Sequence, residues 1–240
     1  MQGLGQYKQA IGIVGGMGSY ATLDFFGRLI KSFPAEKDWD RPRILIDNRC
    51  TMPSRVRAIL YGERVDEVSD MLAESVRNLI HSGADVLVLA CNTSHVFLPE
   101  IIKRVPEAEG KFVNIIESLS DSLLACDTRT FRLMASEGTL DSRVYQLYLN
   151  SYGIEIEPPN PDEYPIYRGL IEDVKQDRVN EDTVARFVDA VEMGDNDHVI
   201  IGCTEFPPIY RLAAERLAED GYHVFDPLDT TIAKIKSILK

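Results

Sequence analysis

Two cysteines stand at matching points in the two halves of the chain, each directly after a short apolar run. Cys91 follows Val86–Ala90 and Cys203 follows His198–Gly202, and their separation of 112 residues (203 − 91) is close to half of the 240-residue chain. Each run predicts a buried strand, and a helix-like stretch follows, so each sulfur is expected between a strand's C-terminal end and a helix's N-terminal end. Such a thiol pair suits an enzyme that moves a proton on two opposite faces of one substrate. That is the chemistry of a racemase working without a cofactor.

The residues that follow Cys91 support this interpretation. A helix N-terminus favours the thiolate and so lowers the pKa of a thiol. Asn92 and Thr93 offer hydrogen-bond donors beside the sulfur. His95 lies four positions after Cys91, on the same face of the expected helix, where it could tune the thiol or relay protons. A histidine with a purely structural role is the alternative.

The second cysteine is followed by a similar set. Thr204 offers a donor beside Cys203, and Glu205 either relays protons or only caps the helix. Free cysteine is often no more than a small buried hydrophobic residue. We interpret Cys50 and Cys126 in that way, because neither has the strand-and-helix setting.

A glycine turn follows the first apolar run of the chain. Gly16-Met17-Gly18-Ser19-Tyr20-Ala21 matches the GxGxxA pattern of dinucleotide sites. However, the acidic residue available for a ribose, Asp47, lies 29 residues past Gly18 (47 − 18), later than the usual ~20. Backbone N–H groups at such a turn serve a small carboxylate equally well. Gly16 and Met17 are therefore candidate substrate contacts.

Two arginines follow the second apolar run, in the segment Met52-Pro53-Ser54-Arg55-Val56-Arg57. Guanidinium groups at a strand end can bind carboxylates with two parallel hydrogen bonds. The alternative is that both arginines are solvated on a surface helix. The sequence alone leaves these two interpretations open.

Composition narrows the possible partners. The net charge of −12 argues against nucleic acid, because a phosphate backbone needs a basic surface, and it requires that any anion site be built from local cations. The four cysteines form no CxxC pair, so we expect neither a metal site nor a disulfide framework. No signal peptide is recognisable and the apolar runs are far shorter than the ~20 residues that span a bilayer. We therefore expect a cytoplasmic protein that does not enter a membrane.

Strand and helix signals alternate along the chain, which is typical of an α/β fold of parallel sheets flanked by helices. The expected strands are 10–14, 43–47, 85–90, 112–116, 131–135, 154–157, 198–202 and 223–226. The expected helices are 20–33, 65–81, 96–104, 118–125, 142–152, 181–193, 209–220 and 228–239.

A coarse repeat predicts two similar domains. Each half runs from a strand through a glycine-containing turn to a helix, and later reaches its cysteine-bearing strand. We expect residues 1–116 plus 227–240 to form the domain carrying Cys91, and residues 117–226 the domain carrying Cys203. Ligands of parallel sheets bind at the carboxyl ends of the strands, so the expected active site is the cleft between the two domains.

The motifs together resemble the aspartate/glutamate racemase family over nearly the whole chain. The matching segments are Gly12–Gly18, Cys91-Asn92-Thr93-Ser94-His95, Glu137-Gly138-Thr139 with Tyr145 following, Ile166-Tyr167, and Gly202-Cys203-Thr204-Glu205-Phe206. The chain looks closer to the aspartate racemase branch, because glutamate racemases usually carry His where this chain has Glu205.

The resemblance implies an enzyme with two α/β domains, commonly a homodimer, that uses neither pyridoxal phosphate nor a metal. Cys91 and Cys203 would be its acid and base. Arg55 matches the family's carboxylate-binding arginine, and Thr139 lies in a matching motif that we take as a substrate contact. A lysine that helps to hold the distal carboxylate in aspartate racemases is replaced around Tyr164-Pro165.

The sequence therefore predicts a cofactor-independent amino-acid racemase that interconverts L- and D-aspartate, or glutamate, with a small acidic amino acid as its partner. One alternative is a decarboxylase or cis–trans isomerase of a small dicarboxylate on the same scaffold. Such relatives often retain a single cysteine, so the presence of both favours racemisation. A two-lobed ligand-binding protein is a more distant alternative, since it would have no need of paired thiols.

Overall fold

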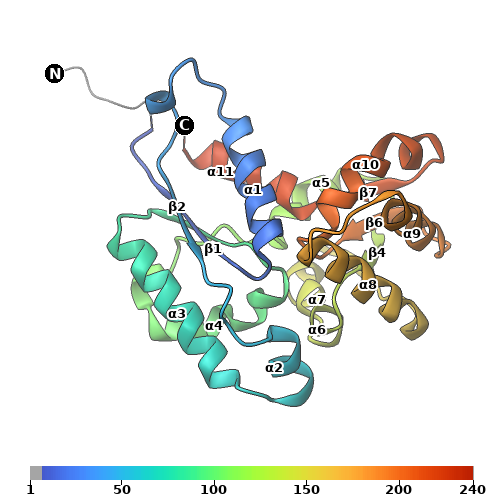
Figure 1. Cartoon of the computed structure of the whole chain (residues 1–240), viewed down its shortest axis with the longest axis horizontal. Helices are drawn as coiled ribbons and strands as arrows, with labels where there is room; N and C mark the ends of the chain where they lie inside the picture. The colour runs from blue at the N-terminus through green and yellow to red at the C-terminus, as the bar shows by residue number, and fades with distance from the viewer. Residues whose placement is uncertain (1–6, 240) are drawn as a thin grey trace.

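The computed structural model describes residues 7–239, which form two parallel sheets joined side by side and flanked by helices (Figure 1). The first sheet has the strand order β2 (Ile44–Asn48), β1 (Ile11–Gly15), β3 (Val86–Leu89). The second has the order β5 (Glu155–Glu157), β4 (Thr130–Met134), β6 (His198–Ile201), β7 (His223–Phe225). This arrangement confirms the α/β fold class.

The two sheets repeat one pattern of pairing. In each sheet the first strand of the half lies in the middle, with the next strand of the chain on one side and the cysteine-bearing strand on the other. Ile11 of β1 pairs with both Ile44 and Val86, and all five residues of β1 are buried. Apolar residues on both faces are what a parallel strand covered by helices requires. Within residues 7–239, no helix is long and apolar enough to cross a membrane.

The helices agree with the expected ones in most places. α3, for example, buries Val68, Leu72, Val76 and Leu79, a spacing that places one apolar stripe on the sheet. The bounds are α1 (Ser19–Ser32), α2 (Arg55–Tyr61), α3 (Val65–His81), α4 (Leu98–Arg104), α5 (Ser120–Leu124), α6 (Glu137–Asp141), α7 (Val144–Leu149), α8 (Tyr164–Lys175), α9 (Glu181–Glu192), α10 (Phe206–Glu219) and α11 (Pro227–Ile238). Short 3₁₀ turns lie between them, among them η2 (Thr93–Phe97) and η4 (Glu117–Leu119).

One expected strand does not form. Phe112 makes a single parallel bridge with Leu87 of β3, where Val113 donates to the Leu87 carbonyl at 2.9 Å. The strand predicted over 112–116 stops there because the Asn114 side chain accepts hydrogen bonds from the N–H groups of Ile116 (2.9 Å) and Glu117 (3.2 Å). An Asn side chain that bonds ahead along its own backbone makes a turn. The bridge still occupies the place that β7 has in the second sheet.

Several helix predictions also need correction. α2, α6 and α8 lie in segments where no helix was expected. The helix predicted over 142–152 begins only at Val144, because Arg143 before it has a left-handed backbone (φ 52°). Cys91 is followed by the 3₁₀ turn η2, not directly by an α-helix.

The two halves share part of their apolar core. One cluster of buried side chains runs from Ile13 on β1 to Leu133 on β4 and Ile200 on β6. After β7 the chain returns to the first half, where α11 packs beside α1 (Figure 1). Asp226 caps α11 by accepting from the Leu228 N–H at 2.8 Å and also accepts from Arg28 of α1 at 2.6 Å. The predicted domain limits at 116/117 and 226/227 stay a prediction.

A buried ion pair fixes α8 against the second sheet. Arg132 of β4 donates to the Glu163 carboxylate just before α8, and to the backbone oxygens of Ala190 (3.0 Å) and Val191 (2.9 Å) on α9. Tyr167 of α8 donates to the same carboxylate at 2.6 Å. Arg132 and Glu163 are both almost fully buried, so each charge needs these partners. The network sets which face of α8 turns toward the first half.

Candidate active site

The two cysteines that open the sequence analysis lie at equivalent positions in the structure. Cys91 is two residues past the end of β3, and Cys203 is two residues past the end of β6. Both side chains are buried, and both line one cavity of about 60 Å³ between the two sheets. The remaining lining residues are Met17, Ser54, Arg55, Val56, Asn92, Thr93, Ser136, Ile171, Lys175, Thr204 and Glu205.

Cys203 is paired with a carboxylate. Its Sγ donates to Glu205 Oε2 at 3.0 Å. Burial raises the pKa of Cys203 well above its usual value, and the neighbouring charge of Glu205 raises it further. α10 begins only at Phe206, so Glu205 comes between Cys203 and the start of the helix. Cys203 therefore carries its proton at neutral pH.

Cys91 lies among neutral hydrogen-bonding groups instead. The carbonyl oxygen of the Asn92 side chain accepts from the Tyr145 hydroxyl at 2.7 Å, across the seam between the halves. Thr93 Oγ1 lies 3.0 Å from Ser136 Oγ and 2.8 Å from Thr139 Oγ1. These contacts connect the loop after β3 to α7 and to the start of α6. They hold the first sulfur in place relative to the second half.

The His95 ring holds the loop after β3 through contacts with two backbone groups. Its Nδ1 lies 3.0 Å from the Cys91 carbonyl oxygen, and its Nε2 accepts from the Ile115 N–H at 3.3 Å, so the ring proton is on Nδ1. Burial lowers its pKa from 6.5 to about 4, which keeps the ring neutral at pH 7. His95 is not one of the cavity-lining residues. The geometry assigns it the positioning of Cys91, and the proton-relay role predicted for it has no path to the cavity through this ring.

Arg55 presents an unpaired guanidinium to the cavity. Ser54 caps α2, and this places Arg55 at the first helical position. Its Nη1 donates to the Pro53 carbonyl (2.8 Å) and its Nη2 to the Met17 carbonyl (3.1 Å). Among residues 7–239 it forms no ion pair, whereas Arg57, two residues further on, is exposed and paired with Glu63 at 2.6 Å. The residue pattern alone left these two arginines alike and only the family resemblance favoured Arg55, whereas the structure separates them.

Lys175 is a cation of the cavity wall that sequence reasoning missed. It is the last residue of α8, and its Nζ donates to Glu172 Oε1 at 2.9 Å. Burial lowers its pKa, but the hydrogen bond to Glu172 and the charges of Glu205 and Cys203 raise it on balance. The signal for α8 was present, since Ile166, Tyr167, Leu170, Ile171 and Val174 repeat at helical spacing.

Two other predicted contacts lie outside the cavity lining. The Gly16 N–H, expected to meet a substrate carboxylate, donates to Thr22 Oγ1 at 2.9 Å. Gly16 has φ 81°, and a Cβ there would come within 2.5 Å of the Arg49 backbone, so its role is to shape the turn. Thr139 acts through Thr93, as described above. The described residues contain no cluster of three or more His, Cys, Asp or Glu side chains suited to a metal ion.

Three buried polar atoms of the cavity residues have no hydrogen-bond partner within residues 7–239. They are Arg55 Nε, Asn92 Nδ2 and Glu205 Oε1. An unpartnered buried polar atom is costly, so a native structure that keeps three around one cavity has a reason for them. Two of the atoms are donors suited to carboxylates, and the third is an acceptor suited to an ammonium group. Together they match the functional groups of an amino acid.

Comparisons with known proteins agree with this chemistry. A family model described as Asp/Glu/Hydantoin racemase matches residues 14–235. Glutamate racemase of Jannaschia sp. (strain CCS1) is 27% identical over 236 residues, covering 90% of this chain and 79% of that protein. The broad specificity amino-acid racemase RacX of Bacillus subtilis (strain 168) is 28% identical over 153 residues, 61% of this chain and 63% of that one. Among solved structures, Picrophilus torridus aspartate racemase is 26% identical and superposes with a TM-score of 0.79, covering 95% of this chain and 94% of that chain.

Proposed function

This chain belongs to the Asp/Glu/hydantoin racemase family of cofactor-independent isomerases, and we propose that it interconverts L- and D-aspartate, with glutamate as its second substrate. Cys91 and Cys203 are the two bases, one on each face of the α-carbon. The resemblance to aspartate racemases in fold and in the Gly202–Glu205 motif favours aspartate. The glutamate racemases among its sequence relatives keep glutamate in the proposal.

The observation that carries the proposal is the composition of the cavity. It brings together two buried thiols, two free donors and one free acceptor. In the proposed pose, Glu205 Oε1 accepts from the substrate's ammonium group and Asn92 Nδ2 donates to its α-carboxylate. Arg55 binds the side-chain carboxylate. Donors aimed at the α-carboxylate stabilise the charge that develops there when the α-proton leaves.

The proton transfers follow from the states of the two thiols. In the proposed mechanism, the direction that starts with Cys203 as the thiol requires Cys91 to be the thiolate, which removes the α-proton from its face. Cys203 then gives its own proton to the opposite face, which inverts the centre and leaves Cys91 protonated and Cys203 as thiolate. The reverse direction starts from that second state. Glu205, hydrogen-bonded to Cys203 Sγ, is placed to exchange the proton with solvent between turnovers.

The pairing of the thiols also separates this proposal from its alternatives. Decarboxylases and cis–trans isomerases on this scaffold often retain a single cysteine, so two buried thiols held against the same space favour racemisation. A homodimer, which the family resemblance implies, belongs to the same proposal. Analytical ultracentrifugation of the purified chain tests that part.

Chiral chromatography of the purified protein with a panel of L- and D-amino acids tests the reaction. Without added cofactor, each enantiomer of aspartate should give an equal mixture of both, with slower conversion of glutamate. In D₂O the product should carry deuterium at the α-carbon, because the incoming proton comes from a thiol that exchanges with solvent. Conversion of neutral amino acids alone would reject the acidic substrate, and no conversion of any amino acid would reject racemisation.

A further inference from the structure

The cavity that contains the sulfurs is the innermost of three neighbouring hollows. Next to it lies a middle chamber of about 200 Å³, and beyond that an outer groove of about 820 Å³. The middle chamber shares lining residues with the sulfur cavity: Ser54, Val56, Ser136, Ile171 and Lys175. It shares three others with the outer groove: Glu137, Tyr164 and Arg168. The shared lining residues place the three hollows next to one another, in order from the outer groove to the thiols.

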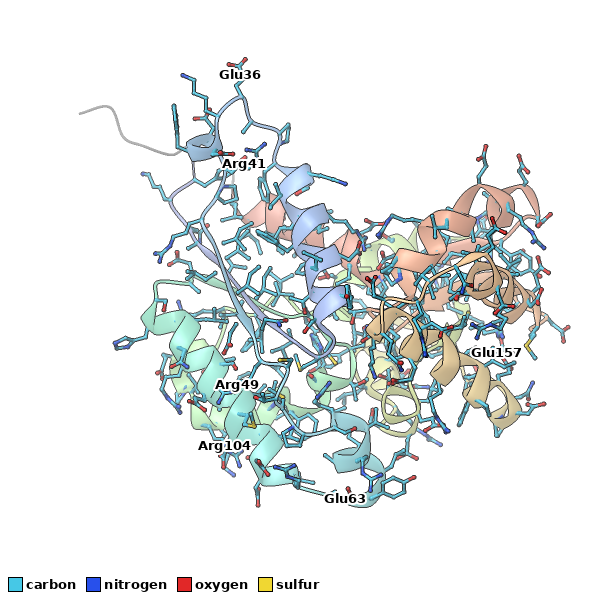
Figure 2. All side chains as sticks on the ribbon, in the orientation of Figure 1. Glu36, Arg41, Arg49, Glu63, Arg104 and Glu157 are labelled. Carbon is cyan, nitrogen blue, oxygen red and sulfur yellow. The ribbon has the colours of Figure 1, made fainter. Side chains whose placement is uncertain are left out.

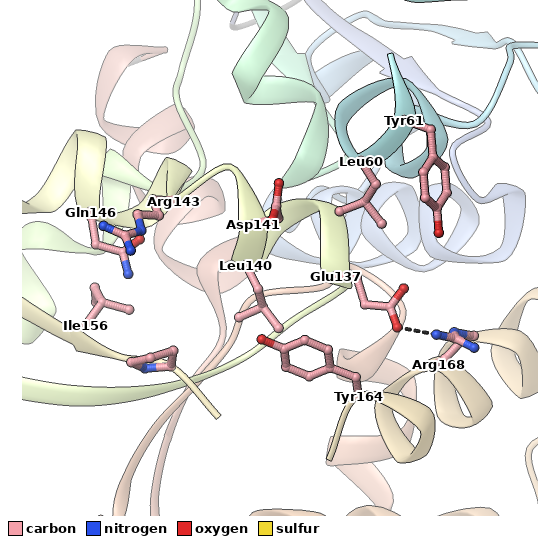
Figure 3. Close-up of a pocket in the computed structure, with 11 residues that line it drawn as sticks. Leu60, Tyr61, Glu137, Leu140, Asp141, Arg143, Gln146, Ile156, Tyr164 and Arg168 are labelled. Atoms are coloured by element: carbon pink, nitrogen blue, oxygen red, sulfur yellow. Dashed lines mark hydrogen bonds and ion pairs between the residues drawn. The ribbon is translucent and has the colours of Figure 1, made fainter. Parts of the chain in front are cut away.

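An ion pair stands where the middle chamber meets the outer groove. Glu137 of α6 accepts from Arg168 Nη2 of α8 (Figure 3). Tyr164 lies beside the pair, and Leu60 and Tyr61 of α2 face it from the first half (Figure 3). The Arg168 side chain is 63% exposed and that of Glu137 is 23% exposed. An ion pair so open to solvent is weak, and its partners exchange readily.

A second pair lies deeper along the same helix. Lys175 and Glu172, 2.9 Å apart, both line the middle chamber, and Lys175 also reaches the sulfur cavity. The chamber wall thus alternates cation and carboxylate from the outer end to the inner end. A zwitterionic amino acid carries both signs of charge, so it can replace one partner of each pair without leaving a charge alone.

We propose that the middle chamber is an access subsite for the amino acid, and that the Glu137–Arg168 ion pair closes its entrance. We call this ion pair the entrance pair. The arriving carboxylate displaces Glu137 from Arg168 and passes to Lys175 at the inner end, from where the sulfur cavity is next. The identity of the ligand rests on the proposed function, whereas the route to the thiols rests on the shared walls alone. Glu36 and Glu63, by contrast, point outward at the edge of the molecule (Figure 2).

The route can be tested through the thiols without any racemase assay. Both sulfurs are buried, so a small alkylating reagent must travel inward before it reacts, while the exposed Cys50 reacts directly and serves as an internal reference. We would compare iodoacetamide, which is neutral, with iodoacetate, which carries a carboxylate. Peptide mass spectrometry gives the alkylation rate of Cys91 and Cys203 relative to Cys50 in the same sample.

Two variants break the entrance pair and leave opposite charges at the entrance of the chamber. Glu137→Gln leaves Arg168 without its partner, and Arg168→Gln leaves Glu137 without its partner. Both should speed alkylation of the buried thiols by iodoacetamide at least about threefold. Iodoacetate should be favoured by Glu137→Gln and disfavoured by Arg168→Gln, so its rate relative to iodoacetamide should differ about tenfold between them. The matched control is Arg64→Gln, because Arg64 is equally exposed (63%) and paired with Glu67 away from all three hollows.

The outcomes separate this inference from the proposed function. If Cys91 and Cys203 are alkylated at the same rate in both entrance-pair variants as in the wild type or in Arg64→Gln, the access route is wrong, even if the protein racemises aspartate. If the charge-dependent difference appears while no acidic amino acid is racemised, the route is supported and the proposed substrate is wrong. If alkylation by iodoacetamide and by iodoacetate is accelerated equally in both variants, the structure has loosened in general, and the proposed role of the entrance pair is rejected.

Discussion

Replacement of Arg55 by Ala should reduce kcat/KM for aspartate by at least about a hundredfold. Arg55 is the one cavity-lining cation without a carboxylate partner among residues 7–239; the residue is half-buried and its Nε is enclosed, so the substrate's side-chain carboxylate would complete a pair inside the cavity. Removing one partner of a buried pair costs roughly 3–5 kcal/mol. At about 1.36 kcal/mol per tenfold, this corresponds to a loss of about two to nearly four orders of magnitude. The contact is remote from the reacting carbon, so KM should rise more than kcat falls.

Initial rates measured by chiral chromatography, with aspartate and alanine as paired substrates, make this prediction specific. Alanine has no side-chain carboxylate, so Arg55→Ala should change its rate far less. Arg57→Ala is the matched control on the same helix, because Arg57 is exposed and bound to Glu63. The reasoning about Arg55 is refuted if Arg55→Ala leaves aspartate turnover unchanged. It is equally refuted if the wild type racemises alanine or serine faster than aspartate.

Three further predictions concern the thiols, the absence of a cofactor and the buried histidine. Cys91→Ala and Cys203→Ala should each abolish racemisation with the circular dichroism spectrum intact, while Cys50→Ala and Cys126→Ala should be nearly silent; near-normal turnover in either of the first two would reject the two-base assignment. Dialysis against a chelator should leave activity unchanged, and the protein should show no visible absorbance band of an imine; metal-dependent recovery would count against this. His95 has a folded-state pKa of about 4 against 6.5 unfolded, so its stabilising effect is complete above about pH 6.5 and is lost as the pH falls toward 4. Between pH 7 and pH 4.5, the free energy of unfolding of the wild type should fall by roughly 2–3 kcal/mol more than that of His95→Asn, as measured by urea unfolding.

β1, β3 and β6 could be predicted well because a parallel strand buried on both faces is a nearly uninterrupted apolar run. The segment 112–116 has such a run, yet Asn114 ends it, since its side chain competes for the backbone N–H groups that a strand needs. The opposite error occurred at α8. No helix was expected there, although Pro165 occupies the first turn of α8, where a missing N–H costs nothing.

The candidate site could be predicted in its chemistry more than in its contacts. Cys91, Cys203 and Arg55 were found from motifs, because strand ends and a helix start fix where they lie. Gly16 was misjudged because its N–H bonds to Thr22, a contact within the turn that no motif states. Lys175 was missed because it reaches the cavity only through the way α8 is packed. That packing depends on the buried Arg132–Glu163 pair, whose partners are 31 residues apart in the chain.

The repeat explains where the two sulfurs lie, but it does not make them alike. Each is two residues past the end of its strand, so the fold supplies the symmetry that a reaction on two faces needs. The residue two positions after each cysteine then breaks it. After Cys203 that residue is Glu205, whose carboxylate holds the thiol proton, and after Cys91 it is Thr93, whose hydroxyl is engaged with Ser136 and Thr139. Two thiols in identical surroundings would have equal proton affinity, so neither would be the preferred site for a proton. In the proposed two-base mechanism, the carboxylate of Glu205 favours the state in which Cys203 holds its proton, and with it the direction of turnover that starts from that state.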